Sequence, residues 1–260
     1  MSESKFLFNG GQCRTYKDGE VPVKFEKVPF TKVKVVEMPP FEVHPKFADK
    51  DYVVTSDLTE FIPNVTAAMC DWWWGNMEKG YNVWAPGEHY GFTWQVPPCE
   101  IGYEGSVEIS YEFDPHNPLA LTRLSMKEYP FTECMEHCWM SACMLGPVQT
   151  FLIHMYEDTE GGILWRSVQF MTKANAAIMA SIADKMPDLS SHMEYESGRL
   201  NVVLPPLYTL WINHPDPWEN VKFNLTMVKN EDGTWRHKYK NLPPEKHADG
   251  TWSYVEPRED

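Results

Sequence analysis

The sequence predicts an α+β fold in which an antiparallel sheet wraps around a C-terminal helix. Residues 149–156 and 163–172 are rich in β-forming side chains and are joined by a polar link with two glycines, which is typical of a hairpin. Residues 189–204 follow and have the composition of a helix that ends before Pro205-Pro206. Strands that precede a late helix favour segregated elements over an alternating α/β order.

Ahead of the hairpin, the chain divides into an arm, a helix and a strand. Residues 1–56 are rich in Pro, Lys and Glu, and we expect them to form an N-terminal arm laid over the main body. Asp57-Leu-Thr-Glu60 has the pattern of a capping box, so we expect a helix over about 63–79 that ends at Gly80. Residues 107–113 alternate apolar and polar side chains, which predicts a half-buried strand.

After the hairpin, residues 174–185 are helix-prone until Pro187 interrupts the pattern. We expect the main domain to span residues 57–211. Residues 212–260 form a Pro-rich extension in which 222–228 and 234–239 can pair as a hairpin.

Composition excludes several classes of function. The chain has 260 residues and is 43% hydrophobic, which supplies enough apolar surface for a folded core. Lys and Arg number 23 against 37 Asp and Glu, for a net charge of −14, and no basic stripe offers a nucleic-acid surface. The longest apolar run is far shorter than the roughly 20 residues of a membrane span. No signal pattern opens the chain, and six scattered cysteines suit reduced thiols, so we expect a cytoplasmic protein without membrane contacts.

Metal ligands are suggested first by His192 and Glu196, which lie four residues apart on the expected helix and so project from one face. That spacing is common by chance, and a solvated helix face is the alternative. His89 lies in a turn-rich stretch, and Glu100 follows Pro97-Pro98-Cys99. A hydrogen-bonded loop histidine and an exposed carboxylate are the alternatives for these two residues.

Several motifs, spread in order over about residues 57–210, carry a resemblance to a known family. They are Asp71-Trp-Trp-Trp-Gly75, Tyr81-x2-Trp84-x-Pro86-x2-His89, His154 with Arg166-Ser167, and His192-x3-Glu196 ahead of Leu204-Pro-Pro-Leu-Tyr208. In this order they resemble the phloretin hydrolase and 2,4-diacetylphloroglucinol hydrolase family. The resemblance implies a helix-grip fold of the START type and a zinc ion that serves hydrolysis of the carbon–carbon bond between an acyl group and a phenolic ring.

The resemblance also implies the metal ligands. Carried over residue by residue, they are His89, Glu100, His192 and Glu196, with Glu104 as a competitor for Glu100. Two imidazoles and two carboxylates nearly neutralise Zn²⁺, and a further coordination position can hold a water whose pKa falls toward ~7. The same donors also suit Fe²⁺, Mn²⁺ and Ni²⁺.

Roles in the pocket follow from the same resemblance. It implies that His154 transfers protons and that Tyr81 lies near the substrate; the alternatives are a hydrogen-bonded strand histidine and a packed aromatic. Four further residues are expected to contact the substrate: Trp72, Trp84, Phe92 and Gln169. Of the three consecutive tryptophans at 72–74, at most two can face a ligand, because successive helix positions point about 100° apart.

Two further groups are expected to be structural. We expect Arg166 to pair with a carboxylate such as Glu157 across the hairpin. Cys134, Cys138 and Cys143 lack the spacing of structural zinc sites and are expected to be inert thiols.

Phe92 and Gln169 stand where the best-known family members present Asn and Tyr, so diacetylphloroglucinol itself need not be the substrate. The expected function is therefore metal-dependent hydrolysis of an acylated polyphenol, of the phloretin or acylphloroglucinol type, by a homodimer. Two alternatives remain open: a non-enzymatic helix-grip carrier of an apolar aromatic ligand, and a metal-dependent isomerase or decarboxylase acting on a related phenol.

Overall fold

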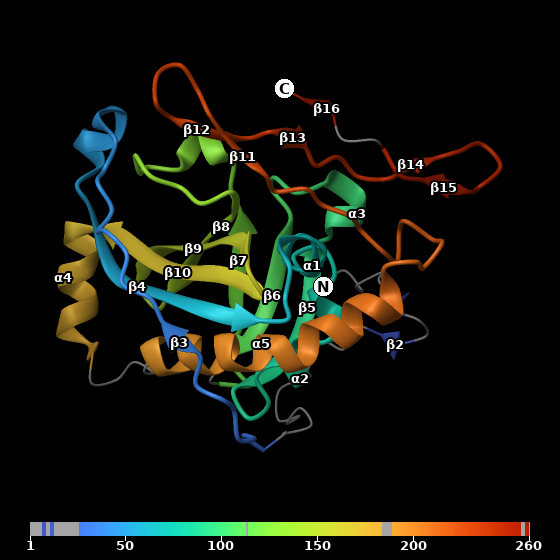
Figure 1. The fold of residues 1–260 in the computed structure, drawn as a ribbon, viewed down its shortest axis with the longest axis horizontal. Helices are drawn as coiled ribbons and strands as arrows, with labels where there is room; N and C mark the ends of the chain where they lie inside the picture. The colour runs from blue at the N-terminus through green and yellow to red at the C-terminus, as the bar shows by residue number, and fades with distance from the viewer. Residues whose placement is uncertain are drawn as a thin grey trace.

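The computed structural model describes residues 26–112, 114–183, 189–255 and 258–259, together with the backbone of two short paired strands, β1 (Leu7–Phe8) and β2 (Gly11–Gln12). Its main element is an eight-stranded antiparallel sheet in the order β3-β4-β10-β9-β8-β7-β6-β5 (Figure 1). The strands are β3 (Lys34–Val35), β4 (Tyr52–Pro63), β5 (His89–Val96), β6 (Val107–Glu112), β7 (Leu119–Arg123), β8 (His137–Leu145), β9 (Val148–Thr159) and β10 (Gly162–Thr172).

Helices connect and cover these strands. They are α1 (Ala67–Trp73), α2 (Tyr81–Trp84), α3 (Pro98–Ile101), α4 (Lys173–Ser181) and α5 (Leu189–Trp211), with short 3-10 turns at Pro45–Lys50, Met77–Lys79 and Met126–Glu128. The longest helix, α5, packs against β4, α1 and α2 (Figure 1). The mixed fold with a large antiparallel sheet and a C-terminal helix is therefore confirmed.

The predicted hairpin at the centre of the sheet is confirmed. β9 and β10 pair from Gly162 opposite Thr159 to Phe170 opposite Phe151, so both strands are longer than their β-rich runs. The turn consists of Glu160 and Gly161, and the positive φ of Gly161, 81°, suits a residue without a side chain.

The predicted helix over 63–79 is corrected. Residues 57–60 lie within β4, where Asp57 faces Val168 and Glu60 faces Trp165 on β10. This long-range pairing overrides the local capping-box pattern. The helix begins later, after Thr66, whose hydroxyl accepts a hydrogen bond from the Met69 amide at 3.3 Å. It ends at Trp73, and the chain continues through shorter turns to Gly80.

The predicted end of the long helix is also corrected, because α5 continues through Pro205 and Pro206 to Trp211. Each proline removes one backbone donor, so the carbonyls one turn earlier lose their helical partners. That turn faces outward, with Val202 57% exposed, so water can replace the lost bonds. Buried Leu204 before the prolines and Leu207 after them both pack on the core and hold the helix in one piece.

The remaining elements agree with expectation where the structure describes them. β6 covers 107–112 of the strand expected over 107–113, and position 113 lies outside the described residues. α4 (Lys173–Ser181) begins one residue before the helix expected over 174–185 and ends sooner, because Ile182 and Ala183 are no longer α-helical; Pro187 also lies outside the described part of the chain.

The tail beyond α5 contains a hairpin that is shorter than the one expected over 222–228 and 234–239, and it packs on the main body. β11 (Met227–Lys229) and β12 (Trp235–His237) pair with Met227 opposite His237. The amide of Leu225 donates to the buried carboxylate of Asp71 on α1 at 3.2 Å. The remaining strands are short pairs, β13 (Tyr239–Lys240) with β16 (Arg258–Glu259) and β14 (Glu245–Lys246) with β15 (Trp252–Ser253).

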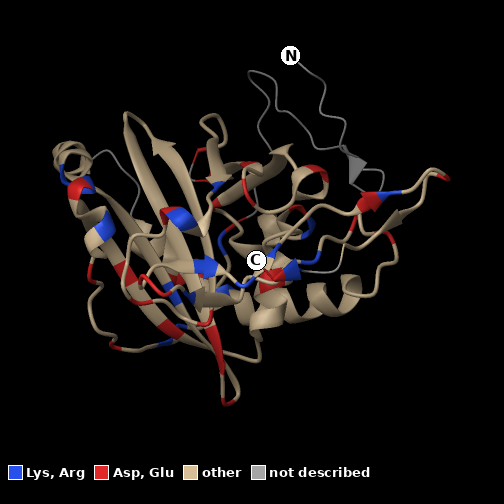
Figure 2. Cartoon of the chain, turned by 90° about the horizontal axis from the view of Figure 1, so that it is seen from above, with Lys and Arg blue, Asp and Glu red and all other residues tan. Residues whose placement is uncertain are grey.

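Charge is distributed over all of these elements. Figure 2 shows Lys and Arg positions interspersed with Asp and Glu positions along the strands and loops. Within the described residues, no helix combines the length and the apolar character that a membrane crossing requires.

Candidate functional site

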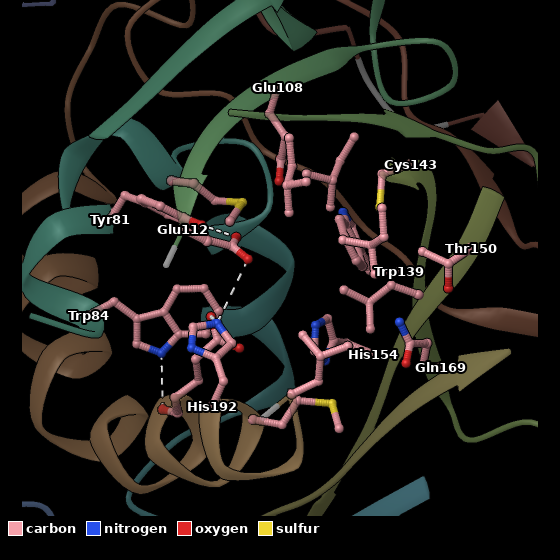
Figure 3. A pocket seen from close by; sticks show the side chains of 18 of the residues that line it. Tyr81, Trp84, Glu108, Glu112, Trp139, Cys143, Thr150, His154, Gln169 and His192 are labelled. Atoms are coloured by element: carbon pink, nitrogen blue, oxygen red, sulfur yellow. Dashed lines mark hydrogen bonds and ion pairs between the residues drawn. The ribbon is translucent and has the colours of Figure 1, made fainter. Parts of the chain in front are cut away.

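A pocket lies between the sheet and the beginning of α5 (Figure 3). Its walls are largely apolar and include Trp74, Trp84 and Trp139. Seven polar residues also line it: Glu108, Glu112, Thr150, His154, Gln169, His192 and Glu196. A mostly apolar cavity with a few converging polar groups is the usual form of a small-molecule site.

The first imidazole of the site belongs to His89, the first residue of β5, which is completely buried. Its Nδ1 lies 2.9 Å from the backbone carbonyl oxygen of Tyr81. In the neutral ring, donation of Nδ1–H to that carbonyl makes Nε2 the acceptor. This buried Nε2 has no hydrogen-bond partner of acceptable geometry, although Glu196 Oε1 lies 3.0 Å away. A buried imidazole nitrogen without a hydrogen bond, on a ring that an acceptor orients at Nδ1, is typical of a histidine that binds a metal ion.

The second imidazole belongs to His192, near the start of α5. Its Nδ1 lies 2.7 Å from Glu88 Oε2, so this ring is also oriented by an acceptor at Nδ1. Its Nε2 lies 3.5 Å from Glu196 Oε1 and 3.8 Å from Glu112 Oε2. Both histidines therefore present Nε2 to Glu196 and have an acceptor at Nδ1, in the arrangement that is usual for histidines bound to metal ions.

Glu112 completes the cluster from the end of β6. One ligand atom each from His89, Glu112 and His192 lie within 4.8 Å of one another. Glu196, one turn beyond His192 on α5, adds the second carboxylate through its contacts with both imidazoles. The hydroxyl of Tyr81 donates a hydrogen bond to Glu112 Oε1 (Figure 3), so this carboxylate is oriented as well.

Three of the four predicted ligands thus come together, and the fourth is corrected. Glu100 lies exposed on α3, and its competitor Glu104 is exposed too; neither lines the pocket. β5 ends before α3, and the chain returns along β6 in a register that sets Glu112 directly opposite His89. The glutamate of the site is therefore chosen by cross-strand pairing rather than by closeness in sequence.

The pKa values of the cluster reflect the several carboxylates that lie close to His192. Burial alone would lower the pKa of His192, but Glu196, Glu88 and Glu112 raise it to about 9. Burial would likewise raise the pKa of Glu88, whereas His192 and Lys27 lower it to about 2. A proton on His192 thus balances negative charge that a divalent cation would otherwise balance.

His154 lies in the wall of the same pocket, on β9 (Figure 3). Burial and the nearby His192 lower its pKa to about 3, so the imidazole is neutral near pH 7. Its Nδ1 lies 2.9 Å from Ser167 Oγ, which itself accepts from Trp165 Nε1 at 2.8 Å. Because the Ser167 oxygen accepts from Trp165, its hydroxyl can donate to Nδ1 of His154. The ring then carries its own proton on Nε2 and offers an Nε2–H donor.

Two of the four expected substrate contacts line the pocket. They are Trp84, which also donates to the Glu196 carbonyl at 3.0 Å, and Gln169. Phe92 does not line it, because its ring packs behind Tyr81 at 5.0 Å.

Trp72 is the other expected contact outside the pocket. It points toward Asn220, to which its indole donates at 2.7 Å. Trp74, two positions further along, faces the cavity instead, as the 100° turn per helical residue requires.

Sequence reasoning missed a second carboxylate on β6. Glu108 is fully buried in the pocket wall and forms an ion pair with Arg123 at 2.7 Å. Burial raises the pKa of Glu108 to about 7, even though Arg123 opposes the change. The signal was present in the alternating strand, where Glu108 and Glu112 share one face.

Of the residues expected to be structural, Arg166, Cys134 and Cys138 do not line the pocket, whereas Cys143 does. Arg166 pairs with Asp57 of β4 at 2.6 Å rather than with Glu157, and it also donates to the carbonyl of Pro39 in the arm. Cys138 is completely buried, and burial raises the pKa of its thiol well above the usual range. Cys134 and Cys143 are half-buried, free thiols.

Comparisons with known proteins add little to this geometry. No protein-family model matches the chain, and no curated protein matches it significantly. Among solved structures, it is similar to protein Ms6760 from Mycobacterium smegmatis, with 14% identity over 67% of this chain and 96% of that chain and a TM-score of 0.41. Major latex-like protein 151 from Panax ginseng gives 13% identity over 58% and 95% of the two chains and a TM-score of 0.39. At these scores the similarities support no conclusion about activity.

Proposed function

We propose that this protein is a metal-dependent hydrolase that cleaves the carbon–carbon bond between an acyl group and a polyphenol ring. The proposal extends the sequence resemblance to the phloretin hydrolase and diacetylphloroglucinol hydrolase family, with its helix-grip fold. The observation that carries it is the convergence of His89, Glu112, His192 and Glu196 beside an aromatic pocket.

The donor set fits a divalent transition metal. Two imidazole nitrogens and two carboxylates suit zinc, and Fe²⁺, Mn²⁺ or Ni²⁺ can use the same donors. The buried Nε2 of His89, which makes no hydrogen bond, and the oriented Nδ1 atoms of both histidines support this assignment. An ion held there would supply a Lewis acid that polarises the acyl carbonyl.

The reaction consumes one water molecule. Its hydroxyl adds to the acyl carbon, the acyl–ring bond breaks with its electron pair on the ring carbon, and a proton then adds to that carbon. The products are a carboxylic acid and the deacylated phenol. While the bond breaks, negative charge spreads to the ring oxygens, where hydrogen-bond donors stabilise it.

The pocket residues suit that distribution of charge. Trp84 and Trp139 offer flat apolar surfaces for the ring. Neutral His154 offers an Nε2–H for a ring oxygen, and Gln169 offers an amide beside it. Glu108, with its pKa raised to about 7, can hold a proton near neutral pH and suits the protonation of the ring carbon.

A passive carrier is a less satisfactory interpretation. Buried carboxylates beside an apolar cavity are costly unless they bind a cation, and a carrier of apolar ligands gains nothing from them. Glu112, Glu196 and His192 line the cavity, and the buried His89 contacts Glu196. Storage of an apolar ligand does not account for this cluster.

Product analysis tests the proposal. Zinc-loaded protein is incubated with phloretin and with monoacetylphloroglucinol, and free phloroglucinol and the carboxylic acid are quantified. We expect equal amounts of the two products, and less than about 1% of that rate for Glu112→Gln. Binding of either compound without product in the zinc-loaded protein would favour the carrier. A product of unchanged mass would instead indicate an isomerase.

A further inference from the structure

The arm residues 26–32, which precede β3, pack across the two segments that carry the histidines. Their backbone fits against two glycines. A Cβ on Gly198 of α5 would lie 2.4 Å from Phe30 Cδ2 and 2.8 Å from the Thr31 carbonyl oxygen. A Cβ on Gly87, in the loop just before His89, would lie 2.5 Å from the Lys27 amide nitrogen. Both positions therefore require glycine for the arm to lie as it does.

Tyr195 joins the same three segments. Its hydroxyl donates to the Pro86 carbonyl at 3.0 Å and accepts the Val28 amide at 3.0 Å. The ring of Phe30 packs edge-on against the Tyr195 ring with centroids 5.1 Å apart. One side chain of α5 thus fixes both the loop ahead of His89 and the arm.

Two consecutive ion pairs link the arm to the cluster, Lys27 with Glu88 and Glu88 with His192. The ammonium of Lys27 pairs with Glu88 Oε1, and Glu88 Oε2 lies 2.7 Å from His192 Nδ1. The same ammonium lies 4.4 Å from the centre of the Tyr195 ring. Glu88 therefore has one oxygen on the arm and the other on the imidazole.

We propose that residues 26–31 act as a clasp that slows metal release, with Lys27 as a positioning residue acting through Glu88 on His192. The inference rests on the proposed metal site. The Glu88 side chain is 19% exposed, so without Lys27 it can turn toward solvent and leave the imidazole without its acceptor. Loss of a group that orients a ligand typically weakens metal binding by about 10–100-fold.

The arm supplies its own matched control. Lys32 pairs with Glu194 of α5 at 2.8 Å, so it also joins the arm to that helix. Among the contacts that the structure gives for the described residues, Glu194 has none with His89, Glu112, His192 or Glu196. Replacement of Lys32 therefore removes an ion pair between the arm and α5 and leaves Lys27, Glu88 and His192 unchanged.

The experiment measures zinc release from the full-length protein into excess fluorescent chelator. We expect about tenfold faster release from Lys27→Met, near-normal release from Lys27→Arg, and normal release from Lys32→Met. Gly198→Ala should also speed release, because it displaces Phe30 and Thr31 without altering a charge. In the cobalt-substituted protein, Lys27→Met should shift the visible absorption bands, which a general loss of stability would leave in place.

The outcomes separate the two proposals. Equal release rates for wild type, Lys27→Met and Gly198→Ala would overturn the clasp while the metal site stands. Equal acceleration by Lys27→Met and Lys32→Met would also overturn it, because arm attachment alone would then account for the effect. A wild-type protein that binds neither zinc nor cobalt would overturn the metal site and the clasp together.

Discussion

Without a metal ion, the stability of the protein should fall as the pH rises from 7 to 9. The carboxylates around His192 raise its pKa to about 9, against ~6.5 in an unfolded chain. Because the folded pKa is the higher one, the stabilisation is complete below about pH 6.5 and is lost as the pH rises through about 9. The difference corresponds to about 3 kcal/mol in total, of which about 2 kcal/mol disappears between pH 7 and pH 9.

The assay is urea unfolding of EDTA-treated protein at the two pH values, followed by tryptophan fluorescence. Glu60 and Glu108, whose pKa values burial raises to about 7, change stability mainly below this range. The variant His192→Gln removes the titrating imidazole and should show a much smaller change. If the free energy of unfolding of the metal-free protein is the same at pH 7 and pH 9, the described electrostatics of the cluster are wrong.

Three further predictions concern single side chains. Glu112→Gln should weaken zinc binding at least tenfold in a chelator competition, whereas Glu100→Gln, on the exposed α3, should leave it unchanged; the reverse result would restore Glu100 as the ligand. His154→Phe should keep the zinc but lower turnover about 100-fold, and full activity would remove His154 from the reaction. Leu204→Ala should cost about 3 kcal/mol in unfolding experiments because the side chain is 1% exposed, and a cost below about 1 kcal/mol would mean that Leu204 does not pack in the core as described.

Local signals in the sequence were enough for some elements. The hairpin of β9 and β10 follows from two β-rich runs and a glycine-containing turn, both of which lie close together in the chain. The pairing of His192 with Glu196 follows from helical spacing alone, because residues four apart share a face.

Contacts between distant segments decided the rest. Asp57 and Glu60 look like a helix start, but pairing with β10 makes them part of a strand. Glu112 entered the cluster through its register opposite His89, which depends on where the chain turns between β5 and β6. No short-range pattern encodes that register, and the family resemblance, carried along the sequence, implies Glu100 instead.

The proposed reaction and the clasp both require one divalent ion between two strands and one helix. Calorimetric titration of chelator-treated protein with zinc is the decisive experiment, with His89→Ala as the matched variant. We expect one zinc per chain for the wild type and at least a hundredfold weaker binding for the variant. Absence of zinc binding by the wild type, or equal affinity in both proteins, would contradict the account.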